Sequence, residues 1–135
     1  MIAGTVQGVR VIGAYFPNGQ APDSEKFVYK MAWLNALRAW VQAELQANGK
    51  LVLLGDYNIA PEDRDAHPDW KDEIHVSVPE REAFRRLLDL GLADAFRLFE
   101  QPEKIYSWWD YRMMAFRRNF GMRIDHLLLS QALVP

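Results

Sequence analysis

The sequence predicts an α/β fold, because short apolar runs typical of strands alternate with longer segments of helical periodicity. Residues 9–16 are rich in β-branched and aromatic side chains and end at Pro17-Asn18-Gly19, a strong turn signal. Residues 50–56 form a short, almost entirely apolar run, as expected of a strand buried on both faces. Both segments are therefore predicted to be strands, and the second delivers Asp56 to a loop.

Two helices are predicted around the second strand. The first starts after Ser24, which is a suitable N-cap, and carries apolar residues every three or four positions until Asn48-Gly49 ends it after about six turns. The second opens at Pro79-Glu80-Arg81-Glu82 and ends at Leu90-Gly91, with a short helical continuation over residues 93–99.

The remaining segments are predicted to be loops and two further strands. Residues 57–79 contain three prolines and several acids and are expected to form a long loop, which in a compact domain is usually functional or mobile. Residues 105–109 and 122–129 have the composition of strands, and an arginine-rich stretch joins them.

Composition limits the class of protein. The chain has 135 residues, half of them apolar, which predicts one domain over residues 1–135. It has no cysteine, which excludes a disulfide framework and a thiolate metal site. It also has no apolar run of about 20 residues and no signal-peptide pattern, so we expect a cytoplasmic protein.

The distribution of charge is more informative than the net charge of −2. Residues 112–123 carry four arginines and no acid, whereas residues 56–73 carry seven acids and only two basic residues. The first segment could face phosphates and the second a cation, although both could equally be solvated loop faces.

The motif Gly55-Asp56-Tyr57-Asn58 places a carboxylate and a carboxamide two residues apart, directly after a predicted strand. Phosphodiester hydrolysis uses such a pair: a hard cation and an aspartate prepare a water molecule, and an amide donor stabilises charge on the phosphoryl oxygens. The alternative is a hydrogen-bonded Asx turn, which is the commoner origin of an isolated Gly-Asp-x-Asn. The motif alone does not decide between them.

Asp125 interrupts an apolar strand and is expected in a partly buried polar site, where it could orient a histidine or a metal ion. The alternative is a structural pair with Arg123 or Arg112. His126 should point to the opposite face of the strand, in a packing or surface role. A third signal is residues 107–112, where flat side chains could stack on bases or line a sugar pocket beside an arginine, or could be core.

Together these segments resemble the exodeoxyribonuclease III-like AP endonucleases of the endonuclease/exonuclease/phosphatase superfamily. The matching pieces occur in family order over nearly the whole chain: residues 14–19, 26–30, 54–61, 64–65, 79–82, 91–97, 107–112 and 121–125. The segment Ser-Trp-Trp-Asp-Tyr-Arg separates this branch from the lipid and inositol phosphatases of the superfamily.

The resemblance implies catalytic roles for four residues. Tyr15 would contact the scissile phosphate, Asp56 would prepare the attacking water, and Asn58 would stabilise the transition state. Asp125 would orient a catalytic histidine. Asp56 and Asn58 are also the implied ligands of Mg²⁺ or Mn²⁺.

The resemblance also implies a DNA-binding set. Trp108, Met122 and Ile124 match the pocket for an extruded abasic sugar, which leaves the helix easily because it has no base to unstack. Arg112 matches a side chain that enters the duplex from the groove, and Tyr111 lies beside it. Lys30 and Arg64 are candidates for contacts with the DNA backbone.

The implied fold is a partial two-sheet α/β sandwich of the DNase I-like type, and the implied activity is base-excision repair. The enzyme would be a monomeric 3′–5′ exonuclease on duplex DNA and an endonuclease 5′ to abasic sites. The family's early asparagine, its metal-ligating glutamate and its closing Ser-Asp-His motif have no counterpart here, and neither His67, His75 nor His126 matches the catalytic histidine. We therefore expect a fragment with open sheet edges, limited stability, weak metal binding and little or no activity.

Two other functions fit the same residues. The chain could be a nucleic-acid-binding module that has lost catalysis, or a superfamily relative acting on another phosphodiester. The four catalytic candidates argue against a pure binding module, which has no use for all of them.

Overall fold

The computed structural model describes residues 1–71 and 73–135; Asp72, one of the acids of segment 56–73, lies outside the described residues. A five-stranded sheet of order β1-β2-β3-β7-β4 forms the centre. Its strands are β1 (Ile2–Val6), β2 (Val9–Tyr15), β3 (Leu51–Asp56), β4 (Leu92–Asp94) and β7 (Asp125–Ser130). Only β2 and β3 pair in parallel, and the other neighbours are antiparallel.

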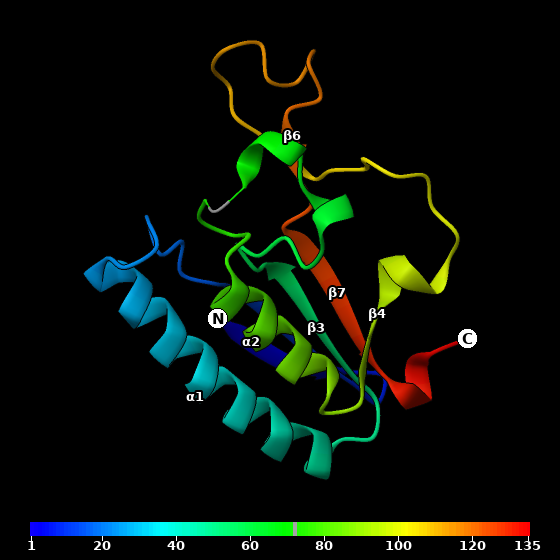
Figure 1. Cartoon of the computed structure of the whole chain (residues 1–135). Coiled ribbons are helices and arrows are strands. Elements are labelled where there is room, and N and C mark those ends of the chain that lie inside the picture. Colours follow the sequence, from blue (N-terminus) through cyan, green and yellow to red (C-terminus); the bar gives the residue numbers. More distant parts are fainter. Residues whose placement is uncertain (72) are drawn as a thin grey trace.

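Two helices, α1 (Glu25–Ala47) and α2 (Val78–Leu88), lie against each other and cover one face of this sheet (Figure 1). The main core lies between the two helices and the sheet and includes Ile12, Leu53, Leu128 and the α2 side chains Phe84 and Leu87. Ser24 caps α1, as predicted, through a hydrogen bond from the N–H of Phe27 to its side chain. Neither described helix is both long and apolar enough to cross a membrane.

The opposite face of the sheet is more exposed. The strand residues on this face alternate with the buried ones, as the period of two requires. Leu127 in β7 is half exposed, and every residue of β1 is exposed. The sheet therefore has one helix-covered face and one open apolar face.

A small second sheet stands at one end of the molecule and consists of β5 (Trp108–Trp109) and β6 (Gly121–Met122). The loop between its strands projects away from the main body, at the top of Figure 1. A second cluster of buried side chains lies beneath it: Ala60, Ala66, Met122 and Ile124, packed against Trp70, Val76 and Trp108.

Several predicted elements have different limits in the structure. The predicted strand 122–129 is divided, because Arg123 and Ile124 separate β6 from β7. The predicted helical continuation over residues 93–99 is wrong in part: Leu92–Asp94 is strand β4, and only Ala95–Leu98 forms a 3₁₀ turn. The long loop contains 3₁₀ turns at Asp63–Asp65 and Pro68–Trp70. The α/β class is confirmed.

Candidate active site

Three of the predicted catalytic side chains lie in a row across three neighbouring strands. Tyr15 at the end of β2 is paired with Asp56 at the end of β3, and Asp56 is paired with Asp125 at the start of β7. Directly paired residues have Cα atoms about 5 Å apart and project their side chains to the same face. Here that face is the open one. The sheet order therefore brings together residues that are more than a hundred positions apart.

The backbone around Asp56 depends on a glycine. Gly55 has φ +139°, and a Cβ atom at this position would lie 1.9 Å from the backbone oxygen of Ala14 in the neighbouring strand. Only glycine fits such a close approach. β3 continues for one more residue, and the carbonyl of Asp56 accepts the N–H of Phe16 at 2.9 Å before the chain leaves the sheet.

Asn58 is held in a turn beneath Asp56. Its N–H donates to Oδ1 of Asp56 at 2.9 Å, so the Asx turn that the sequence left open is present. Its side-chain amide donates to the carbonyl of Phe16 at 2.7 Å, and the residue is only 3 % exposed. Because an amide nitrogen has two hydrogens, this bond leaves Asn58 one further N–H donor.

The carboxyl group of Asp56 is partly buried, and its pKa is raised above the usual range. Burial is the main cause, and the nearby negative charge of Asp125 adds to it, while the N–H of Asn58 and the charge of Lys30 act in the opposite direction. Two carboxylates side by side favour either a proton or a cation between them. The pair, with the amide of Asn58, is thus a donor set that suits a hard divalent cation.

The described part of the chain does not build a complete metal cage. Within residues 1–71 and 73–135, no group of three or more His, Asp or Glu side chains is placed to hold a metal ion. Among the described acids of segment 56–73, three are engaged by arginines: Glu62, Asp63 and Asp65. Asp56 and Asp125 would have to share a cation with water, DNA or other groups.

The expected burial of Asp125 is wrong, because Asp125 is exposed. The alternative, a structural pair with Arg123 or Arg112, is also absent, since these arginines bind other aspartates. Its position is fixed through the backbone, because its N–H donates to Oγ of Ser107 at 3.2 Å. His126 points to the opposite, buried face, as predicted.

Arg123 organises a buried polar network that the sequence did not reveal. It is 4 % exposed and donates to the carboxylates of Asp65 and Asp94, at 2.8 Å each. It also donates to Nδ1 of His126 at 3.1 Å, since a guanidinium cannot accept. Nε2 of His126 therefore carries the proton and donates to the carbonyl of Ile59 at 2.7 Å. The network ties the start of β7 to the loop after Asp56.

The predicted DNA contacts divide into exposed and buried residues. Tyr111 is 93 % exposed, and Arg112 beside it is exposed and pairs with Asp110 at 2.8 Å. Trp108 is half-buried, and Arg64 is exposed and binds Glu62 at 2.5 Å. These four remain predictions of DNA contact.

The other three do not present a surface for DNA in this chain. Met122 and Ile124 are buried in the second cluster. The N–H of Ser107 donates to the carbonyl of Met122 at 2.9 Å, and Oγ of Ser107 accepts the N–H of Ile124 at 3.0 Å. Lys30 is completely buried and bound to Glu80, so the prediction that it contacts the DNA backbone is wrong.

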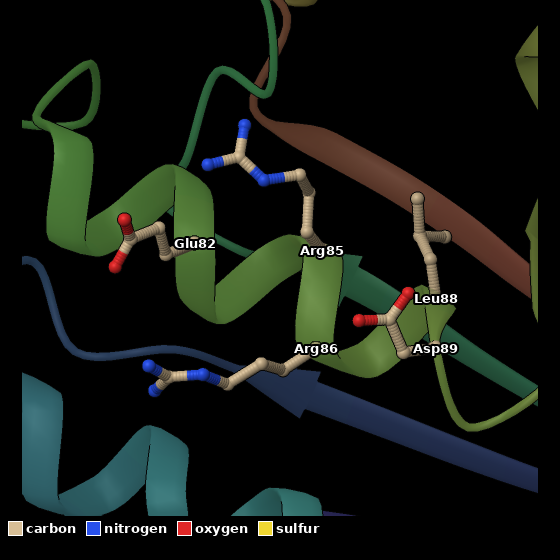
Figure 2. Close-up of a pocket in the computed structure, with 5 residues that line it drawn as sticks. All are labelled: Glu82, Arg85, Arg86, Leu88 and Asp89. Atoms are coloured by element: carbon tan, nitrogen blue, oxygen red, sulfur yellow. The ribbon is translucent and has the colours of Figure 1, made fainter.

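A surface hollow of about 620 Å³ lies elsewhere, on the outer side of α2. Figure 2 shows its five lining side chains, all from one stretch of α2 and the residue after it: Glu82, Arg85, Arg86, Leu88 and Asp89. It carries charges of both signs, which is usual for a solvated helix face. None of the predicted site residues lines it.

Comparison with known proteins identifies the family of this chain. The model of the Endonuclease/Exonuclease/phosphatase family matches residues 3–135. The chain belongs to this family. The resemblance stated from the sequence and the DNase I-like fold class are thereby confirmed.

Relatives within the family are named as DNA-processing enzymes. The chain is 37 % identical to exodeoxyribonuclease III of Haemophilus influenzae, over 91 % of the chain and 50 % of the relative. A 3′ phosphatase from Neisseria, solved with a product DNA hairpin, has a TM-score of 0.94 and 50 % identity over 98 % of the chain and 52 % of that protein. An AP endonuclease from Archaeoglobus fulgidus has a TM-score of 0.90 and 34 % identity, with coverage of 98 % and 52 %. The chain spans about half the length of these family members.

Proposed function

We propose that the protein containing this chain is a metal-dependent DNA phosphodiesterase that cleaves 5′ to abasic sites and removes nucleotides from 3′ ends of duplex DNA. The observation that carries the proposal is the row of Tyr15, Asp56 and Asp125 on one open face, with Asn58 fixed beneath Asp56. Its similarity to exodeoxyribonuclease III and to an AP endonuclease supports DNA as the substrate.

The roles follow from position and charge. Asp56 would take a proton from the attacking water, because its carboxylate lies at the open face beside Tyr15 and Asp125. The free N–H of Asn58 would donate to an oxygen on which negative charge develops. The exposed hydroxyl of Tyr15 would contact the phosphate, and Asp125 would orient a histidine.

Mg²⁺ or Mn²⁺ is the proposed cofactor, with Asp56, Asn58 and the adjacent Asp125 as candidate ligands. When bound, such an ion supplies charge stabilisation and lowers the pKa of a water molecule. The protein's part is to hold the two carboxylates at neighbouring strand ends despite their repulsion.

Removal of a 3′-terminal phosphate is a second candidate activity, because the 50 % identical Neisseria protein is named as a 3′ phosphatase. It needs the same water, acid/base residue and cation, and the same bond to the 3′ oxygen of the DNA breaks; the substrate differs only in that its phosphorus carries no second ester. The substrate range would then be decided by the exposed loop that carries Tyr111 and Arg112.

The test uses the natural gene product that contains this chain and four substrates: abasic duplex, undamaged duplex with recessed 3′ ends, duplex with a 3′ phosphate, and a non-nucleic phosphodiester. We expect cleavage of the first two in Mg²⁺ or Mn²⁺ and none in EDTA. Release of phosphate from the third alone would favour the phosphatase, and cleavage of the fourth alone would favour another phosphodiesterase.

The non-catalytic alternative gives a different result. A binding module would hold duplex DNA in EDTA, lose affinity steeply with salt, and be indifferent to Asp56→Ala, without cleaving any of the four substrates. That outcome would refute the proposed function.

A further inference from the structure

Lys30 is a buried cation that donates hydrogen bonds to the loops next to the candidate active site. It lies in α1 with no exposed surface, and its Nζ donates to three groups: the carboxylate of Glu80, the carbonyl of Asn58 at 2.7 Å and the carbonyl of Asn18 at 3.2 Å. An ammonium group has three donors, and here each has a partner. Burial lowers the pKa of Lys30 below its usual range, although the charge of Glu80 and its hydrogen bond act in the opposite direction.

Glu80 is equally buried and ties the pair to the second helix. It is the third residue of α2, where it accepts from Oγ of Ser77 at 2.7 Å in the capping box that starts the helix. It also accepts from the N–H of His75 at 2.8 Å. The Lys30–Glu80 pair thus joins α1, the start of α2 and the loop that precedes α2.

Lys30 holds the backbone of Asn58. Asn58 has φ +52°, in the left-handed region, which asparagine adopts more readily than most non-glycine residues. Its carbonyl receives Lys30 and also the Nδ1–H of His75 at 2.7 Å. With its N–H bound to Asp56 and its side chain to Phe16, the backbone N–H, the carbonyl and the amide group of Asn58 all have partners.

The same ammonium group also holds the loop that follows Tyr15. Its bond to Asn18 lies three residues beyond Tyr15 in the turn Pro17-Asn18-Gly19. Gly19 makes room for it, because a Cβ there would approach Cδ of Lys30 to 2.9 Å. One buried cation therefore fixes the two loops that follow neighbouring parallel strands and carry site residues.

We propose that Lys30 and Glu80 are positioning residues. From the buried side of the site, they set the geometry of the loops that follow Tyr15 and Asp56, and they therefore control turnover rather than DNA affinity. The proposal rests on the proposed function for its effect on turnover. Its structural half, the fixing of Asn58, can be measured whether or not the protein cleaves DNA.

The experiment compares Lys30→Met, Lys30→Met with Glu80→Gln, and the control Arg10→Met in the natural gene product. The double variant removes the charge that Lys30→Met would leave unpaired, so it separates a loss of folding from a loss of positioning. The control removes a partly buried ion pair between β2 and the same helix, Arg10 with Glu44 at 3.1 Å, far from the loops.

Two readouts are taken: NMR hydrogen exchange of the Asn58 side-chain amide, and kcat and KM on the cleaved DNA. In the double variant we expect faster exchange at Asn58 while the amides of β3 stay protected. We also expect a fall in kcat of about a hundred-fold, as for a catalytic group displaced by about 1 Å, with KM unchanged. Arg10→Met should change neither.

Three outcomes would overturn the inference: exchange at Asn58 as slow as in the wild type, an unchanged kcat in the folded double variant, or a raised KM with unchanged kcat, which is the behaviour of a DNA contact. If the wild-type protein cleaves nothing, the proposed function fails. The exchange rates then still decide whether Lys30 fixes Asn58.

Discussion

Gly55→Ala should destabilise the protein far more than alanine at another glycine of the same sheet. The new Cβ would lie 1.9 Å from the carbonyl oxygen of Ala14, whereas real Cβ contacts are not shorter than 3.0 Å, so β2 and β3 would have to separate by about 1.1 Å (3.0 minus 1.9). The φ of +139° adds strain of about 1–3 kcal/mol. Weakening the adjacent hydrogen bond from Phe16 to Asp56 adds about 1 kcal/mol.

The sum, about 2–4 kcal/mol, is a large part of the stability of an ordinary domain. The control is Gly4→Ala in β1, where no atom lies within 4 Å of the added Cβ and φ is not positive. It should be neutral or stabilising by up to about 1 kcal/mol. Urea unfolding followed by circular dichroism measures both. Equal midpoints for the two variants would refute the claim that the Asp56 loop depends on this close approach.

Three further results are expected. Arg123→Met should cost about 3–5 kcal/mol, because it leaves the buried carboxylate of Asp94 without its cationic partner, while Asp65 keeps its bond to Arg97. Arg64→Met removes only an exposed pair and should cost much less, so equal costs in urea unfolding would contradict the buried network. Ser130→Ala should lower the free energy of unfolding by about 1–3 kcal/mol, because Oγ of Ser130 accepts the N–H of Leu51 at 2.9 Å and donates to the carbonyl of Gly49 at 3.0 Å. An unchanged melting temperature would argue against these two hydrogen bonds. Burial, together with a neighbouring cation, lowers the pKa of His75 and of His126 to about 4. As the pH falls from 6.5 towards 4, the unfolded chain therefore binds protons before the folded chain does, and the free energy of unfolding should fall by up to about 3 kcal/mol per histidine. Urea midpoints that stay constant over this range would contradict neutral, buried imidazoles.

Local patterns predicted the elements that carry the site. The apolar runs of β2 and β3 and the helical periodicity after Ser24 are properties of neighbouring residues, and the structure has these elements at nearly the predicted limits. β1 was missed because all its residues are exposed, which leaves no apolar alternation to detect. The one signal for it was Gln7-Gly8, where both residues have positive φ, as a two-residue hairpin turn requires.

The site itself was only partly predictable. The sequence placed Tyr15 and Asp56 at strand ends, but their adjacency to Asp125 depends on β7 pairing with β3, which is a matter of topology. Lys30 was assigned to DNA by the family resemblance, and its burial depends on Glu80, fifty residues later. Long-range partners of this kind leave no local pattern.

The central claim is that Asp56 is the acid/base residue of a metal-dependent DNA phosphodiesterase. The direct measurement is the single-turnover rate of the natural gene product on abasic duplex DNA in Mg²⁺, for the wild type, Asp56→Asn and the exposed control Asp69→Asn. We predict a rate lower by about 10²–10⁴-fold for Asp56→Asn, which keeps the size of the side chain and loses its proton affinity, with unchanged DNA affinity and an unaffected control. A rate for Asp56→Asn equal to that of the wild type would contradict the account.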